Sequence, residues 1–221
     1  MVTILITAGP TREYLDDVRF LSNGSTGRMG FALATAAMQL GHEPRLVLGP
    51  VEASPPAGVL VRSVTSGLEM RDAAVEWFEG CHVAIAAAAV ADWRPRIRQP
   101  GKPSRQREPG AVERLELVPN PDIVAGLASH KGGRVVVGFA LESASAPMEQ
   151  AVARGREKLL HKGLDLCICN RSDAIGSDAS ETVMVFADGS RRDLGSQDKS
   201  IVASEIVRAA VELYEHRRQS S

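Results

Sequence analysis

Near its start the chain reads Thr3-Ile4-Leu5-Ile6-Thr7, and after a polar segment it continues Ser22-Asn23-Gly24-Ser25-Thr26-Gly27-Arg28-Met29-Gly30. The first run is apolar without alternation, as expected for a strand that is buried on both faces of a parallel sheet. The second opens a segment whose apolar residues recur at helical spacing until Gly41, which stops the helix. A buried strand followed by a helix is the repeating unit of parallel α/β sheets.

The same alternation continues along the chain. Further apolar runs predict strands over residues 45–48, 59–64, 83–88, 134–140 and 164–169, and helical periodicity predicts helices over 70–78, 122–129, 148–162 and 199–217. Residues 182–187 and 191–194, joined through Asp188-Gly189, predict a β-hairpin at one edge of the sheet. We therefore expect an α/β fold: a Rossmann-like, mostly parallel sheet with helices on both faces and a C-terminal β-hairpin that extends it.

Composition limits the size and setting of the protein. With 221 residues, 44% of them hydrophobic, we expect a single domain over residues 1–221. The net charge is −1, from 26 Lys and Arg against 27 Asp and Glu, so the basic excess of a general nucleic-acid binder is missing. The longest apolar stretch, residues 83–91, is far shorter than the roughly 20 residues that cross a bilayer, so no membrane span is expected. Three cysteines, two of them one residue apart, argue against a disulfide scaffold and indicate a reducing, cytoplasmic setting.

One segment differs in composition from the rest. Residues 93–107 carry six Lys or Arg, three prolines and no acid. This composition favours a mobile basic loop, over about residues 93–112, and not a strand or a long helix. Charge runs of this kind are usually solvated surface. This one, however, directly follows the predicted strand at 83–88, and open parallel sheets bind ligands at the carboxyl ends of their strands.

The small residues between the first strand and the first helix predict an anion site. Backbone N–H groups at such a junction can approach a phosphate, and the helix N-terminus adds about half a positive charge. The spacing of Gly24, Gly27 and Gly30 also fits an NAD(P)- or flavin-dependent reductase on a Rossmann-like fold, which stays open as an alternative. Against it, the loop before the glycines is long for a dinucleotide turn, and neither Tyr14 nor Tyr214 has the lysine four residues later that short-chain reductases use.

Other candidate residues each have a structural interpretation as well. Asn23 could donate to a developing oxyanion or simply hold the turn at Gly24. Small residues over 86–91 leave backbone groups open to a base or ribose, or only pack tightly. The run Asn120-Pro121-Asp122-Ile123 predicts a helix start with Asn120 as the N-cap and Pro121 in the first helical position.

Two lysines lie at helical spacing in the second half of the chain, and histidines and cysteines are the potential metal ligands. Lys158 and Lys162 share one helix face, where cations near a C-terminus are stabilising on their own account. The five histidines show no metal spacing, and Cys167 and Cys169 face one side of a strand. We therefore assign no metal site and no thiol nucleophile.

Five blocks of the sequence, taken together and in this order, point to one protein family. They are Ile6-Thr7-Ala8-Gly9-Pro10-Thr11-Arg12-Glu13, Asp17-Val18-Arg19-Phe20-Leu21-Ser22-Asn23-Gly24-Ser25-Thr26-Gly27-Arg28-Met29-Gly30, Ala88-Ala89-Val90-Ala91-Asp92-Trp93-Arg94, Asn120-Pro121-Asp122-Ile123-Val124 and Val137-Gly138-Phe139-Ala140-Leu141-Glu142. The tail adds Lys158, Lys162, Leu164-Asp165-Leu166, Asn170 and Ile175-Gly176-Ser177-Asp178. Together these blocks resemble the phosphopantothenoylcysteine synthetase family over nearly the whole chain.

The resemblance implies a ligase of coenzyme A biosynthesis that joins 4′-phosphopantothenate to L-cysteine. In this family the carboxylate is first activated as an acyl-nucleotidylate, 4′-phosphopantothenoyl-CMP, with release of pyrophosphate, and the cysteine amine then displaces CMP. The resemblance further implies CTP as the co-substrate, with ATP as the eukaryotic alternative, and Mg²⁺ carried with the nucleotide to offset repulsion between the anionic reactants. It also implies a homodimer. In many bacteria this domain is the C-terminal half of a bifunctional chain whose flavin-containing N-terminal half decarboxylates the product. Since the first predicted strand starts at residue 3, we expect the decarboxylase to be a separate chain, unless this sequence is an excised domain.

The resemblance also implies roles for individual residues. Asn23 matches the asparagine that holds the acyl-nucleotidylate and assists its reaction with cysteine. Lys102 matches the family's essential flexible-loop lysine, which contacts the nucleotide phosphates, although Pro103-Ser104-Arg105 replaces the Ile-Lys-Lys that often follows it in bacterial members. The remaining matches are nucleotide-binding positions: Ala86, Ala87, Ala88, Asp92, Pro121, Asp122, Ile123, Val124, Phe139, Lys158 and Lys162.

Three functions thus predict different measurements. The ligase predicts pyrophosphate release only when phosphopantothenate and nucleotide are both present. The reductase predicts a bound dinucleotide and an absorbance change with NADH. A noncatalytic nucleic-acid-binding module that uses residues 93–107 predicts polynucleotide binding that weakens steeply with salt.

Overall fold

The computed structural model describes residues 1–102, 115–171 and 179–220. Its centre is an eight-stranded sheet in the order β12-β11-β10-β9-β6-β1-β4-β5. The strands of this sheet are β1 Thr3–Ala8, β4 Glu43–Leu48, β5 Leu60–Ser63, β6 Val83–Ala86, β9 Val135–Glu142, β10 Leu166–Arg171, β11 Ala179–Phe186 and β12 Arg191–Asp198. The helices are α1 Arg28–Gln39, α2 Gly67–Phe78, α3 Ile123–Ser129, α4 Met148–Lys162 and α5 Lys199–Gln219.

The order of the parallel strands makes the sheet Rossmann-like. β1 pairs in parallel with β4 on one side and with β6 on the other, and β5, β9 and β10 continue outward in parallel. Across the sheet, the parallel strands β5-β4-β1-β6-β9-β10 come third, second, first, fourth, fifth and sixth along the chain, so the winding reverses between β1 and β6. The antiparallel strands β11 and β12 extend the sheet beyond β10. The predicted fold class is therefore confirmed.

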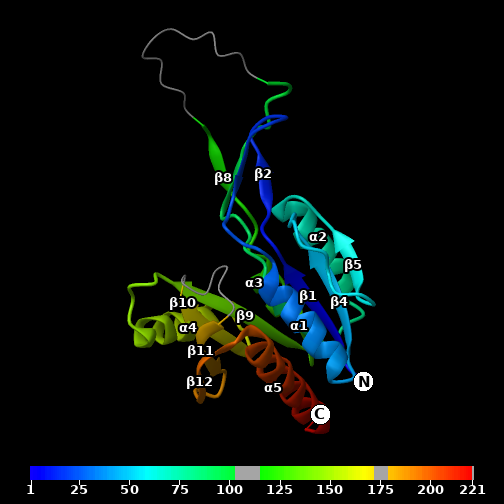
Figure 1. Ribbon diagram of the computed structural model, residues 1–221, viewed down its shortest axis with the longest axis vertical. Helices are drawn as coiled ribbons and strands as arrows, with labels where there is room; N and C mark the ends of the chain where they lie inside the picture. Colours follow the sequence, from blue (N-terminus) through cyan, green and yellow to red (C-terminus); the bar gives the residue numbers. More distant parts are fainter. Residues whose placement is uncertain (103–114, 172–178, 221) are drawn as a thin grey trace.

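Helices cover both faces of the sheet (Figure 1). α1 and α5 pack on the face that receives Ile4, Ile6 and Ile168, whereas α2, α3 and α4 pack on the face that receives Leu5 and Val136. Successive side chains of a strand point to opposite faces. Since both faces are covered, apolar residues follow one another directly in the central strands, which explains their lack of alternation.

Two short ladders form an arm that projects from the sheet (Figure 1), in segments where the sequence predicts only loops. β2 Arg12–Tyr14 pairs with β3 Phe20–Ser22, and β7 Trp93–Pro95 pairs with β8 Leu117–Pro119. The prediction that the basic segment holds no strand is therefore wrong at its start, because β8 supplies a partner from far along the chain. The predicted loop from residue 103 to its end at about 112 lies outside the described residues.

The turn between β2 and β3 is organised by two neighbouring carboxylates. Asp16 Oδ1 accepts hydrogen bonds from the backbone N–H groups of Val18 at 2.8 Å and Arg19 at 2.7 Å. These backbone donors, that of Arg19 first, together with the Arg19 guanidinium lower the pKa of Asp16 to about 2. Asp17 Oδ2 accepts from Gly101 N at 2.9 Å, which ties the turn to the chain that follows β7.

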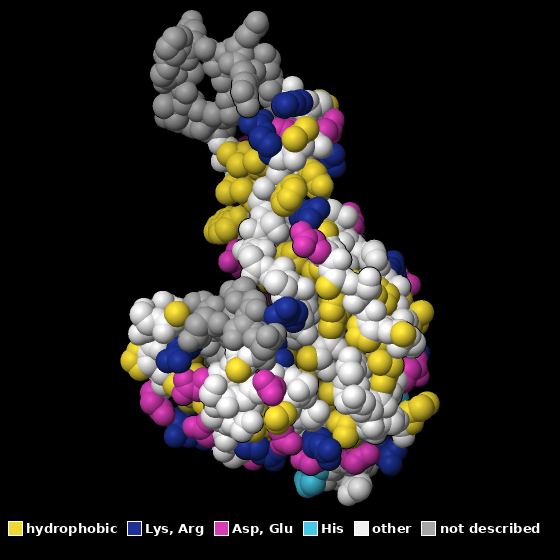
Figure 2. Space-filling view, in the orientation of Figure 1, with side chains coloured by type: hydrophobic (Ala, Val, Ile, Leu, Met, Phe, Trp, Pro, Cys, Tyr) yellow, Lys and Arg dark blue, Asp and Glu magenta, His cyan; other side chains and the backbone are white. Residues whose placement is uncertain are grey.

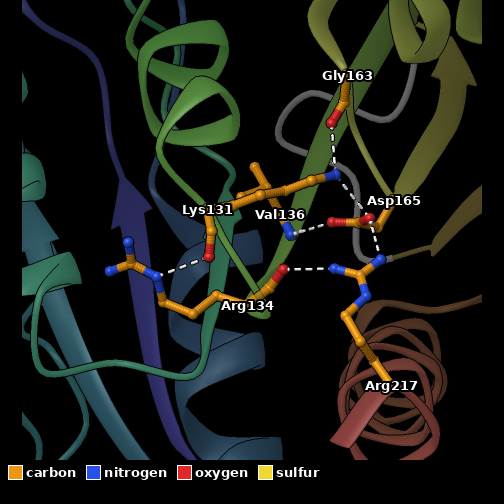
Figure 3. Close-up of polar contacts among 6 residues, drawn as sticks. All are labelled: Lys131, Arg134, Val136, Gly163, Asp165 and Arg217. Atoms are coloured by element: carbon orange, nitrogen blue, oxygen red, sulfur yellow. Dashed lines mark hydrogen bonds and ion pairs between the residues drawn. The ribbon is translucent and has the colours of Figure 1, made fainter. Parts of the chain in front are cut away.

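At the opposite end of the sheet from the arm, a buried carboxylate joins several elements (Figure 3). Asp165 is 3% exposed, and its Oδ1 accepts from Lys131 Nζ at 2.7 Å and from Arg217 Nη2 at 2.6 Å. Its Oδ2 accepts from Val136 N at 2.8 Å. Lys131 Nζ also donates to Gly163 O at 2.7 Å, and Arg217 Nη1 donates to Arg134 O at 2.6 Å. This Asp165 cluster fastens the end of α5 to the starts of β9 and β10.

Predicted and observed bounds differ mainly where strands end. The strand predicted over 83–88 stops at Ala86, because the chain then leaves β9 and runs beside Pro10, with which Ala89 forms an isolated parallel bridge. β12 continues to Asp198, past the predicted end at 194. None of the described helices is long and apolar enough to span a membrane.

Candidate functional site

The candidate site lies beyond the ends of β1 and β6, where the winding of the sheet reverses. The two chain segments that leave these strands are held together, since Ala89 N donates to Gly9 O at 2.9 Å. Open α/β sheets bind ligands in the crevice at such a reversal. Two adjoining cavities are present here, a wider one of about 550 Å³ and a narrower one of about 300 Å³.

The wider cavity is bounded by the small-residue loop that precedes α1, residues 23–27, and by the first residues of α1 up to Gly30. Gly27 stands at the N-cap of α1 with a φ of 75°, a left-handed conformation that favours glycine. Gly30 packs against β1 so closely that an added Cβ would lie 2.2 Å from the Cβ of Ala8. These glycines therefore let the start of α1 lie directly beside the end of β1.

Asn23 connects the two sides of the crevice. Its Nδ2 donates to Val90 O at 3.0 Å and lies 3.4 Å from Ala89 O. The side chain is exposed and lines the wider cavity. Asn23 thus holds the small-residue loop against the segment after β6, and its chemical role stays a prediction.

The narrower cavity lies between the ends of the central strands and the start of α3. Its lining includes Thr7 of β1, Ala86 of β6, residues 121–124 and Lys162 of α4. Of these lining residues, the two strand residues Thr7 and Ala86 have small side chains, which leave space at the strand ends. A flat base or a ribose is the kind of group that such a wall accepts.

The start of α3 differs from the prediction. Asp122 is the N-cap, and its Oδ1 accepts from Ala125 N at 3.1 Å. The assignment of Asn120 as the N-cap is wrong, and so is the placement of Pro121 inside the helix. Asn120 instead ends the β7–β8 ladder: its backbone N–H donates to Asp92 O at 2.8 Å, and its Nδ2 donates to Ala91 O at 2.8 Å.

A close ion pair stands in the narrower cavity. Lys162 Nζ lies 2.5 Å from Asp122 Oδ2. Burial alone would raise the pKa of Asp122, but the hydrogen bonds from Lys162 and from the backbone of Ala125 outweigh it, so that this pKa is lowered. The carboxylate therefore stays charged and both caps α3 and holds Lys162 at the cavity.

Lys158 stands in the wall that the two cavities share, together with Ala88, Val90, Asp92 and Phe139. Its Nζ donates to Phe139 O. Burial lowers the pKa of Lys158, and the nearby Lys162 ammonium lowers it further. Two molecules bound side by side in the cavities would thus meet next to a lysine that is largely shielded from water.

The structure brings most of the predicted site residues together. Asn23 and Ala87 line the wider cavity; Ala86, Pro121, Asp122, Ile123, Val124 and Lys162 line the narrower one; Ala88, Asp92, Phe139 and Lys158 line both. Lys102 lines neither cavity. It is exposed and follows Gly101 on the arm.

Sequence reasoning missed Asn170, Leu141 and Lys199, all of which line the wider cavity. One available signal was position, since Asn170 is the first polar residue after the buried run of β10 and so stands at the carboxyl end of a central strand. The described residues contain no cluster of three or more His, Cys, Asp or Glu side chains that could hold a metal ion.

An open parallel sheet with a crevice at its reversal point and a glycine-rich helix start defines a Rossmann-like α/β protein, and in such folds this crevice is where ligands bind. The family model of the DNA/pantothenate metabolism flavoprotein C-terminal domain matches residues 1–214. The chain belongs to this family, and the resemblance to the phosphopantothenoylcysteine synthetases is confirmed.

Individual relatives agree with this membership. The chain is 45% identical over 168 residues to the coenzyme A biosynthesis bifunctional protein CoaBC of Vibrio cholerae, covering 76% of this chain and 41% of that protein. It is 38% identical over 209 residues to the Bacillus subtilis protein of the same name, covering 92% and 50%. The crystal structure of the C-terminal domain of a CoaBC protein matches with a TM-score of 0.79 and 32% identity, over 97% of this chain and 98% of that one. The chain spans about half the length of the curated relatives it matches.

Proposed function

We propose that this chain is a ligase of coenzyme A biosynthesis that joins 4′-phosphopantothenate to L-cysteine at the expense of CTP. The observation that carries the proposal is the pair of adjoining cavities with Lys158 and Phe139 in their common wall. A nucleotide in one cavity and an organic acid in the other would meet at that wall, which is the geometry that activation of a carboxylate needs. The names of the relatives, which refer to coenzyme A biosynthesis, support the same activity.

We place the nucleoside in the narrower cavity and 4′-phosphopantothenate in the wider one. In the first step, a carboxylate oxygen attacks the α-phosphorus of CTP, the bond from that phosphorus to the bridging oxygen breaks, and pyrophosphate leaves. Lys158 and Lys162 offset the negative charge that gathers between the two substrates. Mg²⁺ enters with CTP as part of the substrate.

In the second step, the cysteine amine attacks the acyl carbonyl of 4′-phosphopantothenoyl-CMP. The bond from that carbon to the phosphate oxygen breaks, CMP leaves, and the amine loses one proton. In this proposal Asn23 holds the acyl group, since a side-chain amide can donate to the oxyanion without changing its own charge. The product has a free carboxylate, and a flavin-dependent decarboxylase is the partner that would consume it.

Lys102 can contact the phosphates only if the arm brings it to the bound nucleotide. Because Lys102 lies on the arm and lines neither cavity, we infer that the arm of the same or of a second copy approaches the bound nucleotide. The side chain would then stabilise charge on the pyrophosphate as it leaves.

We propose a homodimer that is formed through the arm. Of the twelve large hydrophobic side chains that are exposed among the described residues, six belong to the arm: Val18, Phe20, Trp93, Ile97, Leu115 and Leu117. Figure 2 shows hydrophobic side chains along this projection. Exposed apolar surface of this kind is typical of an interface, and a second copy offers the same ladders for an isologous contact.

The test is pyrophosphate release by the purified protein, measured with each ribonucleotide in turn. We expect release with CTP, only when 4′-phosphopantothenate is present, and a thiol-containing conjugate when cysteine is added. Asn23→Ala should still release pyrophosphate and stall before the amide forms. Lys102→Gln should lose the first step, whereas Arg96→Gln, which removes another arm cation from an exposed pair with Glu116, should keep it.

Each negative result of these assays would contradict a different part of the proposal. No conjugate with any nucleotide would overturn the proposal, and a preference for ATP would correct the co-substrate. Normal pyrophosphate release by Lys102→Gln would remove that lysine from the mechanism. The reductase and nucleic-acid alternatives are not favoured by the family, and they predict NADH turnover and salt-sensitive polynucleotide binding, respectively.

A further inference from the structure

Asn170 is a buried amide whose acceptor is unused within the described part of the chain. The residue is 8% exposed, and Oδ1 has no hydrogen-bond partner there. A buried oxygen without a donor loses the hydrogen bonds that water gives it in the unfolded chain, so native proteins keep few of them. Because Asn170 lines the wider cavity, a bound molecule can supply the missing donor.

The described side chains that precede Asn170 on β10 and stand opposite it on β9 are apolar and give its Oδ1 no donor. On β9, Leu141 stands opposite Asn170 in the parallel register. Leu141 and Phe139 add apolar surface to the same cavity. Before Asn170 in β10, Ile168 and Cys169 are fully buried in the two faces of the core. The amide therefore marks the point where the closed interior of the sheet gives way to the substrate cavity.

We propose that Asn170 Oδ1 accepts a hydrogen bond from the amine of the cysteine substrate and positions it for attack. This inference rests on the proposed function and adds the binding place of the second substrate, which no residue discussed above supplies. Asn170 lines the wider cavity, in which Asn23 is placed to hold the acyl group, and is absent from the narrower cavity assigned to the nucleoside.

Among the groups that react, the amine is the hydrogen-bond donor. The carboxylate and the phosphates are hydrogen-bond acceptors, so an amide oxygen repels them, and the same cavity already offers Lys158, Arg28 and Lys199 to negative groups. The amine has N–H donors before the reaction, and after the C–N bond forms the product amide still has one. The contact can therefore persist through the bond-forming step.

A neutral acceptor also suits a nucleophilic amine better than a carboxylate would. A carboxylate at this point would stabilise the ammonium form, which has no lone pair to attack with. An asparagine oxygen binds the amine without holding the extra proton. This difference between amide and carboxylate makes the proposal testable by an isosteric change.

The experiment compares Asn170→Ala and Asn170→Asp with the wild type in the two half-reactions. For Asn170→Ala we expect the KM for cysteine to rise about tenfold, equivalent to about 1.4 kcal/mol of binding free energy. The KM values for 4′-phosphopantothenate and CTP, and the pyrophosphate released without cysteine, should stay within about twofold of wild type, because the lost contact is made only to the amine. Hydroxylamine, a small amine used in excess, should still capture the acyl group.

Asn170→Asp keeps the shape of the side chain and so guards against a folding defect. We expect it to shift the pH dependence of the cysteine step upward, with little effect on pyrophosphate release, because the carboxylate favours the ammonium form. Leu141→Ala changes the same wall without removing an acceptor, and it should not raise the KM for cysteine selectively.

The outcomes separate this inference from the proposed function. A wild-type protein that releases no pyrophosphate overturns both. With an active wild type, an unchanged KM for cysteine in Asn170→Ala overturns the role of Asn170 alone. A rise in the KM for 4′-phosphopantothenate without a rise for cysteine would show that the amide binds the hydroxyl or amide N–H of the pantothenoyl chain instead.

Discussion

At the residue scale, Gly30 fixes how closely α1 approaches β1. An added Cβ at Gly30, in α1, would lie 2.2 Å from the Cβ of Ala8, in β1. Gly30→Ala must therefore push the start of the helix away from the strand. We expect a loss of about 1–3 kcal/mol in the free energy of unfolding, as for other overpacked cores. Urea unfolding followed by circular dichroism measures it.

The control for Gly30 is a glycine with space around it. Gly126 lies inside α3, and nothing lies within 4 Å of an added Cβ. Gly126→Ala should therefore stabilise the protein by about 0.5–1 kcal/mol through its better helix propensity. Equal effects of the two substitutions would show that the contact between α1 and β1 is looser than described.

Residue identities in the cavities were largely predictable, whereas their partners were not. Lys158 and Lys162 could be placed on one face because helix geometry follows from spacing alone. Asn120 and Asp122 are both good N-cap residues, and only the ladder that ends at Asn120 decides between them. Asn170 stood in a recognisable block, but the lack of a donor to its oxygen exists only in three dimensions.

At the element scale, the turn of the arm is the part whose stability depends most clearly on pH. The pKa of Asp16 is about 2 in the folded chain, below its ordinary value of 3.8. The stabilisation that the ionised carboxylate gives is therefore complete above the ordinary pKa and is lost as the pH falls through the folded one. Hydrogen exchange of the Val18 and Arg19 amides, measured between pH 5 and about pH 2, should show protection that fades at the acid end.

Asp16→Asn should remove this acid dependence and lower the protection at every pH, because the amide carries no charge for Arg19 to contact. Asp72→Asn, at an exposed carboxylate beside Arg71 on α2, is the matched control and should leave the arm unchanged. Acid-dependent protection that persists in Asp16→Asn would mean that another group holds the turn.

The two kinds of strand in this fold differ in how much the sequence reveals. Central strands such as β1 and β9 are mostly buried apolar runs, and their predicted ends lie within about two residues of the observed ones. The arm strands have only three residues each, and β7 and β8 also pair across a long sequence distance, as Trp93 does with Pro119. Periodicity cannot detect a strand that is stabilised only by its partner.

At the scale of the whole molecule, the Asp165 cluster couples elements that are distant in the sequence. Asp165→Ala would leave Lys131 and Arg217 without the buried carboxylate to which both donate. We expect a loss of about 3–5 kcal/mol in the free energy of unfolding, as is usual when one partner of a buried ion pair is removed. Guanidinium unfolding gives the value.

An exposed ion pair provides the comparison. Glu76 on α2 lies 2.6 Å from Arg62 on β5, and both side chains are exposed. Glu76→Ala should cost less than about 1 kcal/mol. If Asp165→Ala costs no more than Glu76→Ala, the end of α5 is held by its apolar packing and not by the cluster.

The proposed homodimer is also a prediction about the whole molecule. Sedimentation velocity should give about twice the chain mass of 23.6 kDa. Trp93→Glu should shift the protein toward the monomer, because a charge in an apolar interface is costly. Leu160 lies on α4, away from the arm, and is more exposed than Trp93. Leu160→Glu should therefore leave the mass unchanged. A monomeric wild type would contradict the proposal.

The outer strand of the hairpin determines how the sheet ends. β12 begins with Arg191, Arg192 and Asp193, and its pairing with β11 shifts register at Thr182 and Val183. Charged side chains and a local bulge make a poor template for the backbone of another chain. Concentrated solutions of this protein should therefore resist fibrillar aggregation from that side, even though the strand presents an open row of peptide groups.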